Sequence, residues 1–414
     1  MLQRVNYAVA VILFLFSGII RPQANPLISS IINQVDSGRL MENLEYLTGA
    51  KEVTVPSGTF QILSRHAYEY TNLIAEEYLK QRLEAYGLET YQQNHDNGIG
   101  NIYAIQHGVK YPEQQIIICA HFDSMPRSYI APGADDNGSG TSAVLEAARI
   151  LSKYPTDYTI IYALWDNEEL GLQGSYYYAQ QARLRNDKII AVINMDMIGW
   201  DGNNDNIAEI HFQNYSTSYE IVQKLQEVNT NYNIGLNLLV ANQATTASDH
   251  ASFWYNNYPA VLLIEDYDAT NGSRDFHPYY HTANDRIEYI NKSYFEKCSK
   301  VAIGTVALYA GVQNPTYVHS PLPSSYSLSQ NYPNPFNSTT VINYSIDKEM
   351  PVKIVVHDLI GRELAVLVDE VKPPASYSVN FDASDVRGGL SSGLYFYSMY
   401  SGNYTISRKM LYLK

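Results

Sequence analysis

The chain has 414 residues, a formal net charge of −14, and 45% hydrophobic and 17% charged residues. This length accommodates two or three domains, and the composition is that of a globular protein with an apolar core. The acidic balance argues against nucleic acid and anionic membrane surfaces as partners. The two cysteines, Cys119 and Cys298, exclude a disulfide framework, although one bond between them stays open in an exported protein.

The first 24 residues differ in composition from the rest. Arg4 precedes an unbroken apolar run over residues 8–16, and the segment ends at Ala24 after a proline and a glutamine. A short apolar stretch behind a positive residue is typical of a secretory signal peptide. The run falls short of the roughly 20 apolar residues that a spanning helix needs. We expect a signal peptide over residues 1–24 and no membrane span in the mature chain; a retained anchor is the alternative.

Helices and strands are predicted to alternate up to about Val312. The pattern is mainly helical over residues 27–86, with a helix over 67–86 that stops at Gly87. Short apolar runs predict strands over 99–105, 116–120, 159–165, 189–194, 207–212 (an edge strand) and 260–264. Further helices are predicted over 139–151, from about 170, over 219–228 and over 293–310. Such alternation predicts a largely parallel, twisted sheet with helices on both faces.

Polar side chains follow three of the predicted strands directly. His121 follows the second strand, Glu168 and Glu169 follow the third, and Asp196 follows the fourth. In open α/β sheets, ligands bind just beyond the carboxyl ends of the strands. Three separate strands therefore place residues of types that commonly bind metals at one edge of the sheet.

Five residues in five segments are candidate metal ligands. They are His121, Asp136, Glu169, Asp196 and His281. Two imidazoles and three carboxylates suit a pair of zinc ions, with one carboxylate bridging. Asp123, two residues after His121, can accept the free imidazole N–H and fix the tautomer. In the segment Asp135–Gly140, Asn137 is a good helix N-cap, and the same loop can turn Asp136 towards the metals.

The adjacent residues Glu168 and Glu169 are predicted to have two different roles. Adjacent residues at a strand end point in different directions, so one can bind metal while the other faces the bound water and carries its proton. The alternative is an acidic helix N-terminus stabilised by the helix dipole. Other candidates that could support the ligands are Asp249, His250 and Asp285. We expect His211 to be structural, and His277, which precedes a proline, to shape its loop.

Several sequence strings together resemble one enzyme family. GADDNGSG, NEELGLQGS, NMDM, SDHASF and YHTANDRIEYI lie between about Tyr68 and Val312. Together they resemble the co-catalytic zinc aminopeptidases of the bacterial leucyl aminopeptidase group, which also includes glutaminyl cyclases. The resemblance implies a three-layer αβα zinc-exopeptidase domain, which we expect over residues 25–313.

The resemblance also implies two zinc ions and their ligands. His121 and Asp196 would hold one ion, Glu169 and His281 the other, and Asp136 would bridge them. Glu168 would be the general base for a metal-bridging water, and Asp123 would support His121. A further implied feature is a cis peptide between Asp135 and Asp136.

The implied function is a secreted zinc-dependent aminopeptidase that hydrolyses N-terminal residues from peptides with a free N-terminus. One alternative is a glutaminyl-peptide cyclotransferase-like acyl transfer on the same fold, and another is a non-catalytic binding protein. A carboxypeptidase would need a cation for the substrate carboxylate. Arg127, Arg274 and Arg286 are loop candidates for it, and nothing in the sequence singles one out.

The composition changes again after Val312. Residues 314–325 are rich in proline and serine, which marks a linker. Strands predicted at near-regular spacing over 340–345, 352–358, 363–368, 376–381, 393–398 and 406–413 indicate a small all-β sandwich over residues 326–414. We expect His357 to be a structural strand histidine.

The C-terminal segment has a resemblance of its own. The string YPNPFN at residues 332–337, a Gly-Leu-Tyr sequence at 393–395 and the basic pair Arg408-Lys409 resemble the sorting domain of type IX secretion substrates. The resemblance implies an export machinery as partner and a secreted or cell-surface location. A generic β-sandwich binding module is the alternative.

Overall fold

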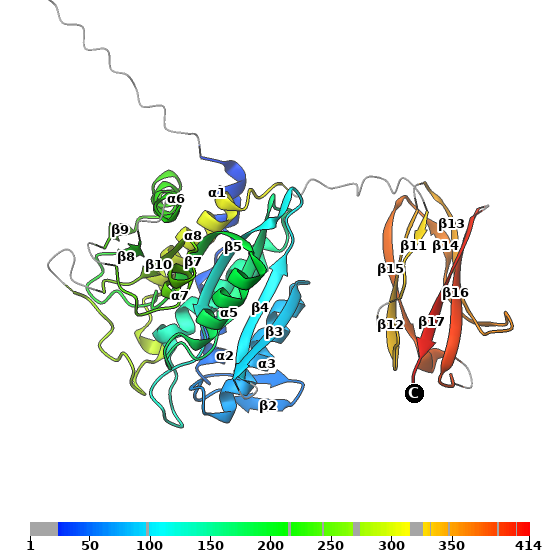
Figure 1. The fold of residues 1–414 in the computed structure, drawn as a ribbon, viewed down its shortest axis with the longest axis horizontal. Coiled ribbons are helices and arrows are strands. Elements are labelled where there is room, and N and C mark those ends of the chain that lie inside the picture. Colours follow the sequence, from blue (N-terminus) through cyan, green and yellow to red (C-terminus); the bar gives the residue numbers. More distant parts are fainter. Residues whose placement is uncertain are drawn as a thin grey trace, which may run out of the picture. The chain divides into compact units, whose positions relative to one another are not determined.

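The computed structural model describes residues 24–414 except 97–98, 214–216, 242–243, 268–273, 315–325, 332, 347, 387–388 and 403. The chain divides into two compact units after Asn314 (Figure 1). The predicted signal peptide, except Ala24, and residues 315–325 of the predicted linker lie outside the described residues. None of the helices in the described ranges is long and apolar enough to cross a lipid bilayer.

The described residues of the first unit contain an eight-stranded sheet in the order β3-β4-β6-β5-β7-β10-β8-β9. Its strands are β3 (Glu89–Asp96), β4 (Ile99–Gln106), β5 (Tyr111–His121), β6 (Tyr158–Trp165), β7 (Lys188–Met195), β8 (Ile207–Phe212), β9 (Asn237–Val240) and β10 (Ala260–Ile264). The central strands β6, β5, β7 and β10 run parallel to one another. The pairs β3–β4, β4–β6 and β10–β8 are antiparallel. The carboxyl ends of the four central strands therefore meet at one edge.

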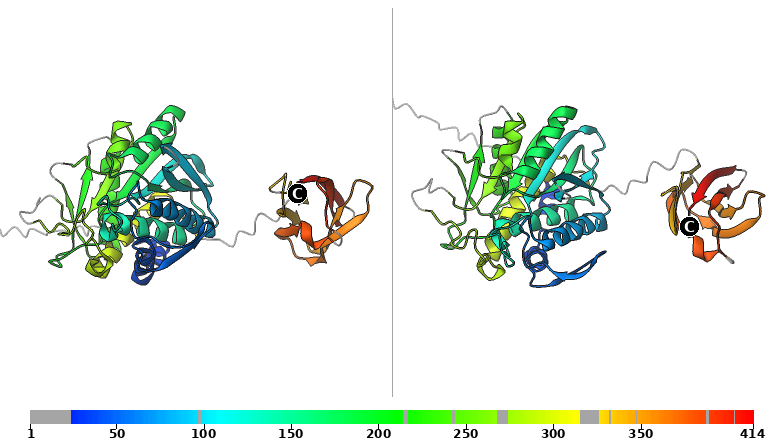
Figure 2. Two further views of the ribbon diagram at one scale, coloured as in Figure 1. Left: turned by 90° about the horizontal axis from the view of Figure 1, so that it is seen from below. Right: turned by 60° about the horizontal axis from the view of Figure 1, so that its bottom comes forward.

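Helices cover both faces of this sheet (Figure 2). Along β5, Ile116 and Ile118 pack into one apolar cluster and Ile117 and Cys119 into another, because successive side chains of a strand point to opposite faces. The first cluster includes α1 (Pro26–Ile32), α2 (Ser37–Leu47), α3 (Tyr70–Ala85), α4 (Gly140–Leu151), α6 (Ser218–Asn231) and α8 (Lys292–Tyr309). The second includes α5 (Gln173–Arg185) and α7 (His250–Tyr255). This is the three-layer αβα arrangement expected from the sequence.

Two local expectations need correction, and one is incomplete. The segment 27–86 is mainly helical as expected, but it also contains a hairpin of β1 (Glu52–Val55) and β2 (Gly58–Gln61), whose alternating residues and Pro-Ser-Gly turn favour strands. β8 is not an edge strand, because the short β9 pairs beside it. Finally, α5 begins at Gln173 rather than near residue 170, since Leu172 has a left-handed φ of 59° that a helix cannot include.

The second unit contains two antiparallel sheets in its described residues. One sheet has β11 (Ser327–Leu328), β12 (Thr339–Ile346) and β15 (Ala375–Asp382). The other has β13 (Met350–His357), β14 (Glu363–Lys372), β16 (Gly393–Ser401) and β17 (Tyr404–Tyr412). Ile342, Ile354, Phe381 and Met410 fill a core of their own. All six predicted strands are present, and β11 is an addition.

Candidate metal centre

The five predicted ligands come from five separate segments. His121 is the last residue of β5, Glu169 follows β6, and Asp196 directly follows β7. Asp136 lies in the π-helical turn η1 (Ala134–Ser139) before α4, and His281 lies in the loop before the 3-10 turn η2 (Ile287–Tyr289). Strand ends therefore supply three of these side chains to the carboxyl edge of the sheet, as the sequence predicts.

The five side chains converge around the carboxylate of Asp136. Asp136 Oδ1 lies 3.3 Å from His121 Nε2, and its Oδ2 lies 3.2 Å from His281 Nε2. His121 Nε2 is also 3.3 Å from Asp196 Oδ1, and His281 Nε2 is 2.9 Å from Glu169 Oε2. Each oxygen of Asp136 thus faces the Nε2 of a different imidazole, and each of these Nε2 atoms faces one further carboxylate.

The donor set fits divalent cations. Asp196 Oδ1 and Glu169 Oε1 are buried and have no hydrogen-bond partner among the described residues. Ligand atoms of His121, Asp136 and Glu169, and likewise of His121, Glu168 and Asp196, lie within 4.8 Å of one another. Buried carboxylates are costly unless a cation or hydrogen bonds compensate them. Imidazole and carboxylate together are ligands that zinc accepts.

The buried carboxylates and imidazoles of this cluster shift one another's pKa values. Burial lowers the pKa of His281, but contacts with Asp136 and Glu169 outweigh it and raise the pKa to about 10. Burial, with the nearby Asp136, raises the pKa of Glu169 to about 8. The pKa of Glu168 is raised well above its usual range, mainly by burial. These shifts follow from the burial of the carboxylates and from their closeness to the two imidazoles.

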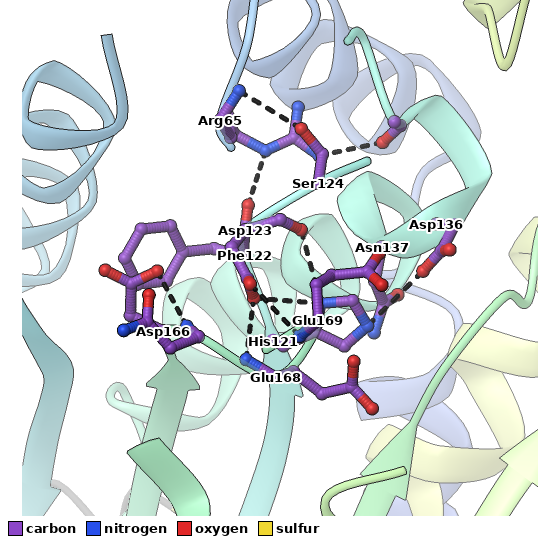
Figure 3. A network of polar contacts seen from close by, with 12 residues as sticks. Arg65, His121, Phe122, Asp123, Ser124, Asp136, Asn137, Asp166, Glu168 and Glu169 are labelled. Atoms are coloured by element: carbon purple, nitrogen blue, oxygen red, sulfur yellow. Dashed lines mark hydrogen bonds and ion pairs between the residues drawn. The ribbon is translucent and has the colours of Figure 1, made fainter. Parts of the chain in front are cut away.

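Asp123 connects two parts of the centre (Figure 3). Its Oδ1 lies 3.3 Å from His121 Nδ1, the contact that the spacing of the two residues predicts. The same carboxylate accepts hydrogen bonds from the backbone N–H groups of Glu168 at 3.1 Å and Glu169 at 3.2 Å. One buried carboxylate therefore orients an imidazole and fixes the backbone that carries both glutamates.

Asp285 holds the turn that presents Asp136. Its two carboxylate oxygens accept from the backbone N–H groups of Asp135 and Asp136, each at 2.9 Å. The Asn137 side chain accepts from the Gly140 N–H at 2.8 Å, as expected of a helix cap. The implied cis peptide between Asp135 and Asp136 is wrong by one bond, because the structure has it between Asp136 and Asn137.

The remaining predicted candidates differ in their relation to the centre. Asp249 is buried, and this burial raises its pKa to about 7 although His121 lowers it. His250 is directed elsewhere, since its Nε2 contacts the Thr245 carbonyl at 3.0 Å and its ring packs edge-on against Trp254. His277 is buried against Trp200. His211 pairs with Glu209 at 2.9 Å within β8, so neither rival histidine joins the ligand group.

Two residues that support the centre cannot be identified from the sequence alone. Arg65 is fully buried, and its guanidinium donates to four backbone carbonyls, those of Leu47, Phe122, Pro132 and Gly133. Burial lowers its pKa to about 10. Ser248 donates a hydrogen bond to Asp196 Oδ2 at 2.7 Å. Both contact residues that lie far away in the sequence, and local sequence patterns do not predict such contacts.

Comparison with known families finds one match in each unit. Residues 101–306 match Peptidase family M28, and residues 330–412 match the secretion system C-terminal sorting domain. The chain is 32% identical over 208 residues to aminopeptidase YwaD of Bacillus subtilis, covering 50% of this chain and 42% of YwaD. It is 31% identical over 211 residues to a probable leucine aminopeptidase of Trichophyton verrucosum, covering 48% and 53%. The matched part spans about half the length of these curated relatives.

Solved structures show the same fold. The LapA aminopeptidase of Legionella pneumophila has a TM-score of 0.59 at 24% identity, covering 70% of this chain and 76% of LapA. A glutaminyl cyclase of Bacteroides thetaiotaomicron bound to N-acetylhistamine has a TM-score of 0.53 at 17% identity, covering 66% of this chain and 98% of the cyclase. The fold therefore occurs in proteins of both names, and the choice between the two activities depends on the site.

Proposed function

The chain belongs to peptidase family M28, and from this premise we propose that it is a zinc-dependent aminopeptidase exported through its C-terminal sorting domain. The observation that supports this most is the carboxylate of Asp136, whose two oxygens each face a different histidine. This is the arrangement expected of a carboxylate shared by two cations. The relatives named as aminopeptidases agree with it.

We propose that two zinc ions bind here. His121 and Asp196 would hold one ion, His281 and Glu169 the other, and Asp136 would be shared. Zinc at this position would polarise the scissile carbonyl and lower the pKa of a coordinated water.

Glu168 is proposed as the residue that moves the proton. Its backbone is fixed by Asp123, and its carboxylate lies within 4.8 Å of ligand atoms of His121 and Asp196. It would accept a proton from the attacking water and donate it to the nitrogen of the departing peptide. Asp123 would keep His121 in the tautomer whose Nε2 is free to bind a cation.

Export is the second part of the proposal. The match of residues 330–412 to a secretion sorting domain supports a secreted or cell-surface location. The N-terminal apolar segment would act as a signal peptide, and the sorting domain would contact the export machinery. The substrates are therefore expected to be extracellular peptides and proteins with a free N-terminus.

The decisive experiment compares a free-amine peptide with its N-acetylated twin. Chelator-treated protein is incubated with each peptide with and without added zinc, and products are identified by mass spectrometry. Stepwise loss of N-terminal residues from the free peptide alone, restored by zinc, is the expected result. Cleavage of neither peptide would contradict the proposal. An N-terminal glutamine peptide in the same assay would then separate a cyclase from a non-catalytic protein.

A further inference from the structure

The loop after β5 connects the two ends of the candidate centre. It begins at Asp123, which contacts His121, and ends at the turn that carries Asp136. Residues 124–131 are closed by a hydrogen bond from Ser124 Oγ to the Ala131 carbonyl at 2.8 Å. We refer to these eight residues as the rim loop. The rim loop therefore runs from a residue that contacts one proposed ligand to the turn that carries another.

The rim loop is fastened to the segment before α3. The Arg65 N–H donates to Ser124 Oγ at 3.1 Å, and the Ser124 N–H donates to the Arg65 carbonyl at 3.3 Å. At the other end of the loop, the Ala131 N–H donates to the Leu63 carbonyl at 3.0 Å. These contacts hold both ends of the loop against the segment before α3.

Arg127 lies in this loop over an aromatic side chain. Its guanidinium is 4.7 Å from the centroid of the Tyr68 ring, a cation–π distance. The Tyr68 backbone N–H donates in turn to Nδ1 of the buried His66. Arg127 is exposed and has no ion pair within 4.0 Å among the described carboxylates. Tyr68 and Tyr129 are 60% and 70% exposed, which leaves this surface open to solvent.

Aromatic rings pack next to His281, another proposed ligand of the centre. Tyr280 stacks on His281 with ring centroids 3.7 Å apart, Phe276 contacts Tyr280, and Tyr267 contacts Phe276. An aminopeptidase must enclose the first residue of its substrate and leave a path for the rest of the chain. The packed aromatic end suits the first residue, and the open rim loop suits the departing part.

We infer that Arg127, oriented by Tyr68, recognises a carboxylate on the C-terminal side of the scissile bond. This inference rests on the proposed aminopeptidase function. The carboxylate could be the free C-terminus of a short peptide or the side chain of an acidic residue. In a chain with a net charge of −14 and a centre rich in carboxylates, such a group is repelled unless a cation offsets the repulsion.

The other two loop arginines are engaged differently. Arg286 Nε donates to the Ala283 carbonyl at 3.1 Å, so part of its guanidinium is already used. Arg274 lies over the rings of Phe276 and Tyr267, at 4.4 and 5.7 Å, on the aromatic side of the centre. Of these three arginines, Arg127 is therefore the one in the rim loop, and Arg286 is a matched control.

The test measures kcat/KM of the full-length, zinc-loaded protein on four substrates: Leu-Ala with a free carboxylate, Leu-Ala-amide, Leu-Glu-amide and Leu-Lys-amide. Wild type should prefer the acid to the amide and Glu to Lys at the second position. Arg127→Gln should reduce at least one of these preferences about three- to fivefold, the effect of losing one solvent-exposed charge pair. Loss of the acid-over-amide preference alone identifies a free C-terminus as the target. Loss of the Glu-over-Lys preference alone identifies an acidic side chain.

Further variants separate charge from folding. Arg127→Lys should retain most of the preference, and Arg127→Glu should shift it towards Leu-Lys-amide. Arg286→Gln should leave both ratios at wild-type values. Unchanged ratios in Arg127→Gln and Arg127→Glu, with the zinc content of wild type, would overturn the inference while the proposed function stands. Absence of turnover on all four substrates would instead reject the proposed function, and this inference with it.

Discussion

At the scale of single residues, two adjacent glutamates have different surroundings. Glu169 Oε2 contacts His281 at 2.9 Å, whereas Glu168 groups with His121 and Asp196. The backbone of both is fixed by the single carboxylate of Asp123. The sequence predicts that neighbouring residues at a strand end diverge, and the structure places them on different partners. Their chemical roles remain predictions that substitution can test.

Glu168→Gln should abolish proton transfer and spare the metals. The amide is nearly isosteric but cannot take a proton from water, so kcat should fall by about 100- to 10,000-fold. Zinc bound per chain, measured by plasma mass spectrometry on the same sample, should match wild type. Glu169→Gln is the matched control and should lose zinc. A near-normal rate in Glu168→Gln would rule out the proposed base.

At the scale of elements, buried polar groups connect helices to the sheet. Glu76 of α3 accepts from the Gly100 N–H of β4 at 3.0 Å and from Gln92 Nε2 of β3 at 2.8 Å. Burial raises the pKa of Glu76 to about 7, although both hydrogen bonds oppose the shift. The helix therefore packs on β3 and β4 through a carboxyl group that prefers to be neutral.

This arrangement predicts a pH-dependent stability contribution from Glu76. The folded state holds the proton more tightly than the unfolded state, whose pKa is near 4.5. The contribution is therefore complete below pH 4.5 and is lost as pH rises through about 7. Between pH 5 and pH 8, the free energy of unfolding of Glu76→Gln should therefore rise relative to that of wild type by about 2–3 kcal/mol. This figure converts the pKa shift to free energy.

The measurement is chemical unfolding of both proteins at the two pH values. Glu84→Gln removes an exposed carboxylate from the same helix and serves as the control. A constant difference in unfolding free energy between Glu76→Gln and wild type across this range would show that the folded state does not retain the proton.

At the scale of the whole molecule, the two units have separate apolar cores. Ile116, Val144 and Val301 belong to the core of the first unit, and Ile354 and Phe381 belong to that of the second. The C-terminal end of the first unit is held against the rest of that unit, because the Gln313 N–H donates to the Pro155 carbonyl at 2.9 Å. All five proposed ligands lie in the first unit.

Truncation after Asn314 should therefore preserve activity and lose export. The truncated protein should bind zinc and hydrolyse free-amine peptides at rates within about twofold of the full chain, because stability effects at separate sites are nearly independent. Immunoblots of cell and medium fractions should show retention in the cell. A folded, zinc-loaded truncation without activity would indicate that the second unit contributes to catalysis.

The sequence by itself predicted six of the eight strands of the large sheet, without β3 and β9, and the candidate ligands. Apolar periodicity and strand ends are local properties of the sequence. The sequence alone therefore predicts that His121, Glu169 and Asp196 lie at one edge of the sheet. The Asp-Asp-Asn-Gly segment likewise predicted a helix start capped by Asn137. Its side chain accepts from the Gly140 N–H, although the residue directly before α4 is Ser139. The family resemblance then assigned the roles that local pattern leaves open.

Only the tertiary structure decided how these residues are held. Asp123 reaches backbone N–H groups 45 and 46 residues away, and Asp285 reaches the Asp136 turn across 149 residues. The buried Arg65 and the surface formed by Arg127 and Tyr68 depend in the same way on distant segments meeting. Local propensity does not encode such contacts, because each is fixed by packing of the whole sheet and its helices rather than by neighbours in the chain.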